Sequence, residues 1–348
     1  MDVLSEVLQA VRLRGALFFN GEFSAPWCLY SVPSSSAVES LLSLVGNSNS
    51  GDSSSGNCGA TASSRERLII FHFLTQGHAY ARLPDGRREE LTSGDIVIVP
   101  NGEAHFIGNG SPEKPIDSFR TFANNLRQGL KVTHFGGGGE ITRFVCGFLA
   151  CEQRLSDVFL SGLPPLLKVR VGNEPSGQWL EHSIRFSVEH ASGSSAGSGL
   201  VLAKLSEVLF VEALRCYVNT LPSSQIGWLA GARDPVIGQA LAALHKEPSR
   251  QWTLQDLAKT TGLSRTRLTD RFRYFLGESP IAYLAQWRLK LGAEMLQETE
   301  SSVAEIAAAV GYGSEATFNR AFKREFHCPP ARFRRGQHSN AAAVGKNA

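Results

Sequence analysis

Two short stretches in the last third of the sequence carry side chains that could bind a polyanion. In each, cationic and small polar residues surround two apolar positions, Leu268 with Phe272 and then Phe318 with Phe322. The surrounding residues are Arg265, Thr266, Arg267, Thr269, Arg271 and Arg273 in the first stretch, and Ser314, Glu315, Thr317, Asn319, Arg320 and Lys323 in the second. Arg can form two hydrogen bonds with guanine and Asn two with adenine, whereas Lys and Ser more often bind phosphate. These residue types favour contacts with double-stranded DNA.

The elements that must position these side chains are helices, and each stretch is preceded by another predicted helix. Thr253 and Asp256 are spaced as a helix N-cap and its partner, and the apolar pattern after them ends at Gly262. Ser302 and Glu305 repeat the cap, and a glycine again ends that helix. Helix, glycine-containing turn and helix is the helix-turn-helix plan. The sequence therefore predicts two copies of it.

A long helix is predicted between the two copies. Ser279 and Pro280 are spaced as an N-cap with proline at the first helical position, and a helical pattern continues from Ile281 to about Gln297. At about 1.5 Å per residue this helix spans roughly 25 Å. It could hold two reading helices near the roughly 34 Å of one DNA turn, in successive major grooves. One such reading helix could equally be a solvated charged surface, but two matched copies favour DNA binding.

Ordered motifs run through residues 235 to 336. They are Leu257-Ala258, Gly262-Leu263-Ser264, Leu268-Thr269-Asp270-Arg271-Phe272, Gly277-Glu278-Ser279-Pro280, Tyr283-Leu284, Ile306-Ala307, Gly311-Tyr312 and Phe318-Asn319-Arg320-Ala321-Phe322-Lys323. Pro329-Pro330-Ala331-Arg332-Phe333-Arg334 closes the series. Together these motifs resemble the DNA-binding domain of the AraC/XylS family of bacterial regulators. The doubled proline and Phe333 depart slightly from the family's closing signature.

The family resemblance implies which side chains would face DNA. In the two reading helices these are Arg265, Thr266, Thr269 and Asp270, then Glu315, Ala316, Asn319 and Arg320. Arg273, Ser314 and Lys323 complete the predicted DNA-binding set. The acid at position 270 is a poor general DNA ligand, because phosphate repels it, but it could accept from cytosine or orient a neighbouring Arg.

The N-terminal part of the sequence is different in character. Leu68–Leu74, Ala79–Leu83 and Asp95–Val99 are short apolar runs separated by turn residues, which predicts a β-sandwich or barrel. The residues from Gly94 to His105, with Asn109, resemble the second cupin motif. Further similarity to the sensor domain of the same regulator subgroup lies in Phe71-His72-Phe73, Cys146-Gly147-Phe148 and Leu163-Pro164-Pro165-Leu166-Leu167.

A small-molecule effector pocket is expected in this cupin-like barrel, since a small barrel can enclose one ligand. We place it near Phe71, His72, Phe73 and His105, and the sequence does not identify the effector. Metal-binding cupins need a further cluster of two His and a Glu, which the sequence lacks. His72, His78 and His105 could in principle bind a divalent ion, but structural or ligand-bonding roles are favoured. We predict no metal and no cofactor.

Two helices are predicted between the strands and the C-terminal region. Trp179–His190 and Leu200–Tyr217 have apolar residues at three- and four-residue spacing and could form an antiparallel pair. That pair could pack against the β domain or form a dimerisation surface, and the sequence favours neither. Residues 221 to 233 are interpreted as an interdomain linker, and residues 47 to 64, rich in Ser and Gly, as a flexible loop.

Composition limits the class of protein. The chain has 348 residues and a formal net charge of +3, yet Arg233 to Gln337 alone hold 16 Lys and Arg against 11 Asp and Glu. The cationic surplus therefore lies in the region with the two predicted DNA-reading helices. Six scattered cysteines without CxxC pairs fit reduced thiols. The sequence lacks the pattern of a signal peptide and any apolar run long enough for a membrane span, so a cytoplasmic location is expected.

These observations predict an α+β protein with a cupin-like β-barrel and an all-α C-terminal domain containing two helix-turn-helix units. The domains are expected at residues 1–170 (sensor), 171–222 (helical dimerisation region) and 233–337 (AraC-type DNA-binding domain). We predict a DNA-binding transcription regulator, not an enzyme. A homodimer is expected, with RNA polymerase as a candidate partner and activation as the provisional direction of control. Two alternatives stay open: a cupin enzyme with an accessory DNA-binding domain, and a ligand-independent architectural DNA binder.

Overall fold

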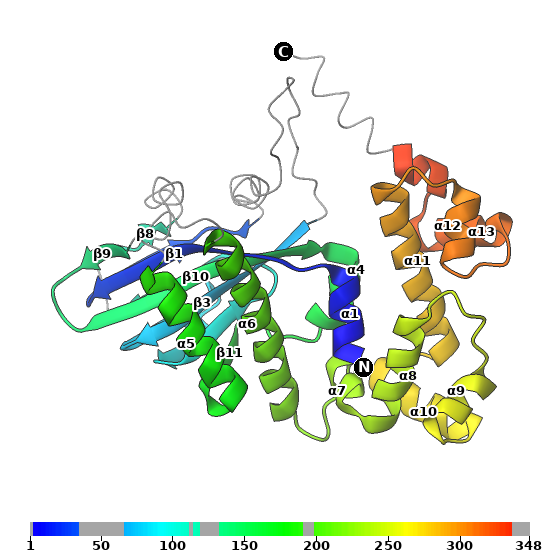
Figure 1. Ribbon diagram of the computed structural model, residues 1–348, viewed down its shortest axis with the longest axis horizontal. Coiled ribbons are helices and arrows are strands. Elements are labelled where there is room, and N and C mark those ends of the chain that lie inside the picture. The colour runs from blue at the N-terminus through cyan, green and yellow to red at the C-terminus, as the bar shows by residue number, and fades with distance from the viewer. Residues whose placement is uncertain (1–2, 35–65, 111–113, 119–131, 191–197, 336–348) are drawn as a thin grey trace, which may run out of the picture. The chain divides into compact units, whose positions relative to one another are not determined.

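The computed structural model describes residues 3–34, 66–110, 114–118, 132–190 and 198–335. The chain forms two compact units, which Figure 1 colours along the sequence. The barrel unit comprises Arg12–Leu221, and the helical unit combines Met1–Val11 with Pro222–Ala348. Val3–Val11 therefore pack with the C-terminal part of the chain, although we expected residues 1–11 in the sensor domain. The predicted flexible loop at residues 47–64 lies outside the described residues.

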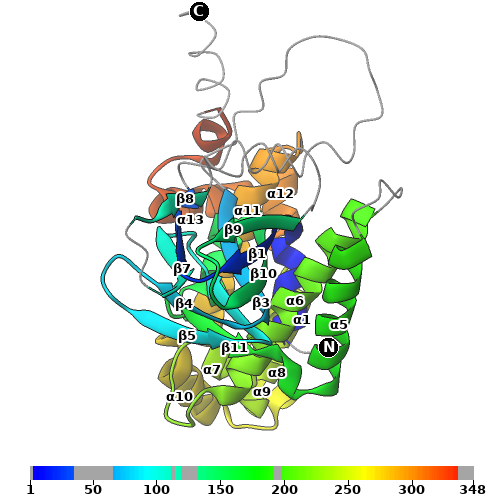
Figure 2. The same ribbon diagram turned by 90° about the vertical axis from the view of Figure 1, so that its left-hand side faces the viewer.

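Two sheets build the barrel unit (Figure 2). One has the strand order β11-β6-β3-β10-β1-β9, and the other has the order β5-β4-β7-β2-β8. The paired strands are antiparallel except for β1 with β9 and β2 with β8. The bounds are β1 Arg14–Ser24, β2 Trp27–Ser31, β3 Glu66–Gln76, β4 His78–Arg82, β5 Arg88–Thr92, β6 Asp95–Val99, β7 His105–Asn109, β8 Ile116–Asp117, β9 Val132–Gly136, β10 Ile141–Glu152 and β11 Leu167–Arg170. The three predicted strands correspond to β3, β4 and β6.

Alternation along the strands places one apolar set in the interior core of the barrel unit. Leu68, Ile70 and Leu74 of β3 belong to this core, so the side chains at the odd-numbered positions between them, Ile69, Phe71 and Phe73, point to the opposite face. Aromatic rings fill much of the interior, and Trp27 stacks on Phe144 with ring centroids 5.1 Å apart. Burying a large apolar side chain contributes about 1.5–3 kcal/mol, so this core stabilises the predicted cupin-like fold.

Helices cover part of the barrel unit. Its described helical segments are α4 Gln153–Leu160, the 3-10 turn Val171–Asn173, α5 Pro175–His190 and α6 Ser198–Thr220. Helix α6 packs against α5 and against β1, β10 and β11. An added Cβ on Gly15 of β1 would lie 2.8 Å from the carbonyl oxygen of Ala203 in α6, so the strand and helix approach closely. The predicted helices at Trp179–His190 and Leu200–Tyr217 are confirmed; α6 packs against strands of the β domain, and α5 packs against α6 and the 3-10 turn.

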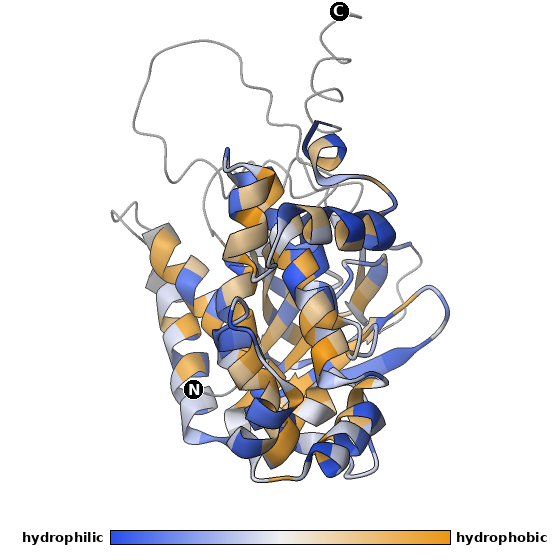
Figure 3. Cartoon of the chain, turned by 90° about the vertical axis from the view of Figure 1, so that its right-hand side faces the viewer, coloured by the Kyte–Doolittle hydropathy of each residue, from blue (hydrophilic) through white to orange (hydrophobic). Residues whose placement is uncertain are grey.

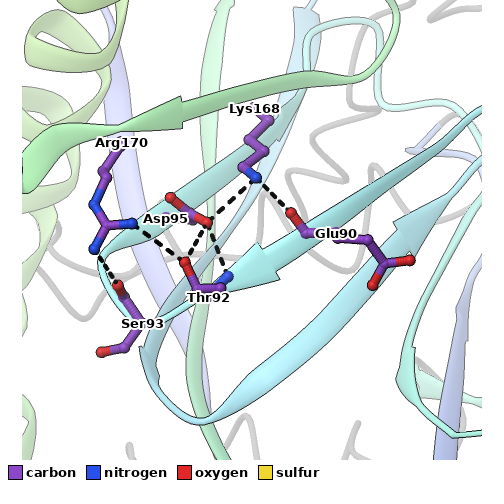
Figure 4. Close-up of polar contacts among 6 residues, drawn as sticks. All are labelled: Glu90, Thr92, Ser93, Asp95, Lys168 and Arg170. Carbon is purple, nitrogen blue, oxygen red and sulfur yellow. Dashed lines mark hydrogen bonds and ion pairs between the residues drawn. The ribbon is translucent and has the colours of Figure 1, made fainter.

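Two residues of the cupin-like motif, Gly94 and Asp95, form a turn that cations of β11 hold in place (Figure 4). Gly94 has φ +90°, where glycine is favoured over other residues. The buried Asp95 carboxylate accepts hydrogen bonds from the Thr92 N–H at 2.8 Å and the Thr92 hydroxyl at 3.0 Å. Lys168 lies 3.5 Å from the same oxygen, and Arg170 donates to the Thr92 hydroxyl at 3.3 Å. This part of the motif therefore serves the fold.

The helices of the helical unit include α1 and α7 to α13. Their bounds are α1 Val3–Val11, α7 Trp228–Arg233, α8 Pro235–Lys246, α9 Leu254–Thr261, α10 Arg265–Leu276, α11 Pro280–Glu298, α12 Val303–Ala309 and α13 Glu315–Phe326. Helix α7 lies inside the stretch interpreted as a linker, so that interpretation is wrong for residues 228–233. The reason is burial, because Trp228, Leu229 and Ala230 are all shielded from solvent.

The predicted helix caps are confirmed. Thr253 with Asp256 and Ser302 with Glu305 form reciprocal capping boxes, and Gly262 ends α9 in the left-handed conformation with φ +67°. Ser279 caps α11, whose 19 residues span about 28 Å. In Figure 3 the helices of this unit carry hydrophobic and hydrophilic residues on different sides, as amphipathic helices must to build a core.

Each helix-turn-helix unit has its own core. In the first, the ring of Phe272 on α10 meets Tyr283 of α11 with centroids 5.7 Å apart. In the second, Phe318 and Phe322 pack with apolar residues of α11 and α12. Phe333, the departure from the family signature, lies against Phe322 with centroids 5.1 Å apart. Its phenyl ring therefore closes the second core by apolar packing.

Candidate nucleic-acid interface

The two reading helices, α10 and α13, have the same register fifty positions apart. Each has twelve residues and follows a Ser N-cap, Ser264 or Ser314, whose hydroxyl accepts from a backbone N–H of the first turn. Each ends before a residue in the left-handed conformation, Gly277 with φ +77° or His327 with φ +57°. The same caps therefore fix the start and the end of both helices.

Apolar anchors decide which side of each reading helix faces outward. Leu268 and Phe272 on α10, and Phe318 and Phe322 on α13, are all 0% exposed. Because these anchors are four residues apart, they form one stripe along the helix and leave the opposite side open to a partner. The structure thus presents two equivalent polar surfaces.

The predicted DNA-binding residues occupy equivalent places on these surfaces. The pairs are Arg265 and Glu315, Thr266 and Ala316, Thr269 and Asn319, Asp270 and Arg320, and Arg273 and Lys323. All of them are exposed except Thr269 and Asn319, which are partly exposed, and the N-cap Ser314 is exposed as well. The structure therefore groups the predicted set into two matching clusters, one on each reading helix.

Most cations of the two clusters are available for an external anion. Within the described residues, no ion pair involves Arg265, Arg273 or Arg320. Thr269 donates to the carbonyl oxygen of Arg265 at 2.9 Å, and Asn319 lies 3.4 Å from Glu315, so these polar groups make only local contacts. Such weakly held side chains can exchange their local contacts for contacts to bases or phosphates.

Arg271 has a different role from its neighbours on α10. Its guanidinium donates to both carboxylate oxygens of Asp234, the N-cap of α8, at 3.1 and 3.2 Å from Nε. Burial raises the pKa of Asp234, but the bonds from Arg271 and from the N–H of Ile237 outweigh it and lower the pKa below its ordinary value. Asp234 was not among the predicted functional residues, although Asp followed by Pro235 at the first helical position is the pattern of a helix N-cap.

A buried polar network joins three further elements of the helical unit. The hydroxyl of Tyr283 on α11 accepts from Trp228 Nε1–H of α7 at 2.8 Å and lies 2.7 Å from His245 Nε2 of α8. Burial lowers the pKa of His245 to about 3, so this histidine is neutral at physiological pH. Helix α8 is thus bonded to the reading helix α10 through Asp234 and to the connecting helix α11 through His245.

The barrel interior contains a second polar cluster. His105 Nδ1–H donates to the Glu103 carbonyl at 2.8 Å, so its Nε2 accepts from His72 Nε2–H at 2.7 Å, and His72 Nδ1 in turn accepts from the Cys146 thiol at 2.7 Å. This chain of bonds requires both rings to be neutral. Burial lowers the pKa of His105 to about 4 and that of His72 well below its ordinary value, and it raises the pKa of Cys146.

The four residues expected at an effector pocket are only partly brought together. His72 and His105 touch in the interior, whereas Phe71 and Phe73 lie on the other face of β3, because neighbouring strand residues point to opposite sides. All four are at most 3% exposed.

Within the described residues, no group of three or more His, Cys, Asp or Glu side chains is placed to hold a metal ion. No described helix is long and apolar enough to cross a membrane.

Comparison with known proteins covers nearly the whole chain. A family model described as "Cupin" matches residues 2–219, and a "Helix-turn-helix domain" model matches residues 257–336. A putative AraC-like transcription regulator of Streptomyces lividans is 31% identical over 271 residues, which are 77% of this chain and 87% of that protein. The chain belongs to the AraC family of transcription regulators. The AraC resemblance seen in the sequence is therefore confirmed at both ends of the chain.

Other transcription regulators are similar to the chain as well. The regulator AlkR of Acinetobacter baylyi is 31% identical, covering 76% of this chain and 87% of its own length, and the activator RclR of Escherichia coli is 28% identical, covering 77% and 84%. Among solved structures, the DNA-binding domain of AdpA in complex with a target DNA is 25% identical, covers 31% of this chain and 96% of its own, and has a TM-score of 0.30.

The AraC-family assignment confirms the predicted class of function. The chain is a transcription regulator with a helix-turn-helix DNA-binding domain and a cupin-like N-terminal domain. Its relatives are regulators, a non-enzymatic function, which confirms the prediction that it is not an enzyme. The alternative of a cupin enzyme with an accessory DNA-binding domain is therefore set aside.

Proposed function

We propose that α10 and α13 enter successive major grooves of one DNA site and read it with their equivalent exposed clusters. The observation that carries this proposal is the shared register of the two helices, from Ser N-cap to left-handed C-cap. Arg265, Asn319 and Arg320 suit base edges, while Arg273 and Lys323 suit phosphates. The connecting helix α11, at about 28 Å, supports a separation close to one DNA turn.

The experiment that tests this proposal is selection of sheared genomic DNA from the protein's own source by the purified chain. We expect the retained fragments to share a motif with two conserved blocks about one helical turn apart. A folded chain that retains fragments with no common motif would contradict sequence-specific reading. The recovered motif also supplies the duplex for the measurements below.

Replacing Arg320 with Ala should weaken binding to the recovered motif by about 1–3 kcal/mol, while binding to random DNA changes little. The reason is that a base contact carries specificity, whereas a phosphate contact contributes on every sequence. Fluorescence anisotropy with both duplexes at one salt concentration measures the difference. Arg87→Ala, which removes an exposed cation from the barrel unit, is the matched control. Equal losses on both duplexes would make Arg320 a phosphate ligand.

We also propose that the chain is a homodimer that associates through α5 and α6. Both helices keep large apolar side chains exposed: Trp179 is 61% and Phe186 is 55% exposed on α5, and Val201 and Val208 are exposed on α6. Trp179 and Phe186 are seven residues apart and so lie on one side of α5. A second copy is the occupant we favour, because a two-fold interface needs only one self-complementary patch.

Trp179→Glu is expected to convert this dimer to monomer, since it places a charge in the proposed contact. Sedimentation velocity over a range of protein concentrations, without DNA, measures the change. Tyr274→Glu is the control, because Tyr274 is a similarly exposed aromatic residue, 57% exposed, in the helical unit. A parent chain that sediments as a monomer at all concentrations would rule the proposal out.

We infer that the cupin-like barrel unit controls DNA binding in response to a small-molecule effector. The cupin match supports a sensor, but one observation favours a second candidate, a ligand-independent regulator: apolar side chains fill the described interior, and His72 and His105 already bond each other. Thermal unfolding of the full chain with fractions of cell extract separates the two. A fraction that raises the unfolding temperature and changes DNA affinity favours the sensor, and no such fraction favours the second candidate.

The AraC-family assignment also supports proposals for the location of the protein, a protein partner and the direction of control. We propose the cytoplasm as the location, because DNA is the ligand. RNA polymerase is a proposed partner and activation a proposed direction of control. A reporter gene placed behind the recovered motif tests the direction of control: its output should fall when the regulator gene is deleted, and a rise would indicate repression.

A further inference from the structure

The two helix-turn-helix units make a contact in addition to the one through their connecting helix α11. The loop of residues 247–253 joins α8 to α9 and so leads into the first unit. Gly311 lies in the turn between α12 and α13 of the second unit and has φ +89°. Its carbonyl oxygen accepts from Gln251 Nε2–H of the loop at 2.8 Å. An added Cβ on Gly311 would lie 2.6 Å from the carbonyl oxygen of Ser249, so the loop and the turn are in close contact.

Arg288 of α11 is bonded to the same loop. Its Nε–H donates to the carbonyl oxygen of Pro248 at 2.7 Å, and its Nη2–H donates to that of Arg250 at 2.7 Å. An added Cβ on Gly311 would lie 2.8 Å from the same Nη2 atom, so the guanidinium lies between the loop and the turn. Hydrogen bonds from a charged donor are stronger than neutral ones, and a guanidinium directs its donors along fixed lines. Arg288 therefore holds the loop in one position.

The loop that Arg288 holds also has internal contacts. Trp252 is 9% exposed, and its Nε1–H donates to the carbonyl oxygen of Glu247 at 3.0 Å. The guanidinium of Arg250 lies 4.0 Å from the centre of the Trp252 ring. The next residue, Thr253, is the N-cap of α9. Because the loop is bonded internally and continues directly into α9, fixing the loop also fixes the first helix-turn-helix unit.

Helix α11 joins the two units as well, because each unit packs on a different part of it (Figure 1). Phe272 of the first unit meets Tyr283 near the start of α11, and Phe318 of the second unit shares a core with Leu289 and Ala293 further along. One shared helix sets the separation along its axis, but long helices bend, and bending changes the angle between the units that they carry. The contact through Arg288 is a second connection that limits this movement.

We propose that Arg288 is the positioning residue that fixes α10 and α13 relative to each other, and that it thereby sets the number of base pairs between the two half-sites. One base pair more or less moves a half-site by about 3.4 Å and turns it by about 35° around the DNA axis. Two units joined rigidly cannot follow that change, whereas units joined by α11 alone can follow part of it. This inference rests on the proposed reading of DNA by both helices.

Fluorescence anisotropy with a series of duplexes tests the inference. Each duplex carries both blocks of the recovered motif, with the spacer unchanged or altered by one or two base pairs in either direction. We expect the parent chain to lose about tenfold in affinity when the spacer changes by one base pair. Arg288→Lys keeps the charge but cannot reproduce the two directed bonds of the guanidinium. It should reduce the loss to about threefold or less.

Arg334→Lys is the matched control. Arg334 is partly exposed like Arg288, and it also donates to two backbone carbonyl oxygens, those of Leu296 and Ser301. These bonds join the end of the second helix-turn-helix unit to α11 and to the segment before α12, so they do not connect the two units. We therefore expect Arg334→Lys to keep the spacer preference of the parent chain. The readout is the ratio of affinities between spacers, which a general loss of stability does not change.

The possible results separate the spacing from the DNA binding itself. An Arg288→Lys chain that keeps the tenfold loss, or a control that loses it to the same extent, overturns the proposal. So does a parent chain that binds all spacers alike, although a shared motif with two blocks would still support the proposed function. If circular dichroism shows that Arg288→Lys is unfolded, Gln251→Ala takes its place, because it removes the bond to Gly311 from the side of the loop. An unchanged spacer preference in that variant also contradicts the proposal. A recovered motif with a single block contradicts the proposed function.

Discussion

Replacing Phe272 with Ala is expected to unfold the first helix-turn-helix unit, at a cost of about 3–5 kcal/mol. Phe272 is 0% exposed and its ring meets Tyr283, which belongs to the hydrogen-bonded network of α7, α8 and α11. The loss therefore combines the apolar contacts of one ring with a cavity beside buried polar groups, which the neighbouring helices can fill only by moving.

Urea unfolding followed by circular dichroism, together with binding to the recovered duplex, measures this loss. Tyr274→Ala is the matched control two residues further along the same helix, because its ring is 57% exposed and its removal should cost less than about 0.5 kcal/mol. Similar small effects of both substitutions would show that Phe272 does not anchor α10, and the assignment of the outward face would then have to be revised.

The barrel unit is expected to lose stability as the pH falls from about 6.5 toward 4. The ordinary pKa of His105 is 6.5, and burial lowers it to about 4 in the folded chain. Burial also lowers the pKa of His72. The unfolded chain therefore binds more protons in this range, so stability rises with pH across it and is fully present above about 6.5. A shift of this size in one histidine corresponds to about 3 kcal/mol.

The physical reason is the arrangement of the two rings. A proton added to His105 Nε2 places two N–H donors 2.7 Å apart, where one donor and one acceptor now meet, and a proton added to His72 Nδ1 removes the acceptor of the Cys146 thiol. Urea unfolding between pH 7.5 and 4, followed by hydrogen exchange of the β3 amides, measures the slope of the unfolding free energy against pH. The double substitution His72→Phe and His105→Leu should flatten it, and His78→Gln, at an exposed histidine paired with Glu140, should leave it unchanged. A slope that survives the double substitution would place its origin elsewhere.

Local signals in the sequence predicted much of the helical unit. Capping residues such as Thr253 and Ser302, turn glycines and apolar spacing act over a few residues, so they are visible without the fold. The two clusters on α10 and α13 follow from the same spacing. The strands β3, β4 and β6 were visible too, because turn residues separate them.

Tertiary contacts were the part that could not be predicted. Nothing near residue 7 indicates that Val3, Val7 and Val11 pack against a helix that begins at Pro235, because that contact joins the two ends of the chain. Asp234 and Arg271 meet across 37 residues, which removes Arg271 from the set of cations available to DNA. The side of β3 on which Phe71 and Phe73 lie depends on register, and the pattern Phe-His-Phe alone does not reveal it.

The two reading helices share their caps and apolar anchors but differ in their exposed side chains. Arg265 stands where α13 has Glu315, and Asp270 stands where α13 has Arg320, so the proposed reading by both helices predicts two half-sites that differ in base sequence. A single chain then fits its site in one direction only. The orientation of the DNA site would then decide which end of the bound regulator points toward the start of the gene. Inverting the site in place would reverse the orientation of the bound protein without changing its affinity for the DNA.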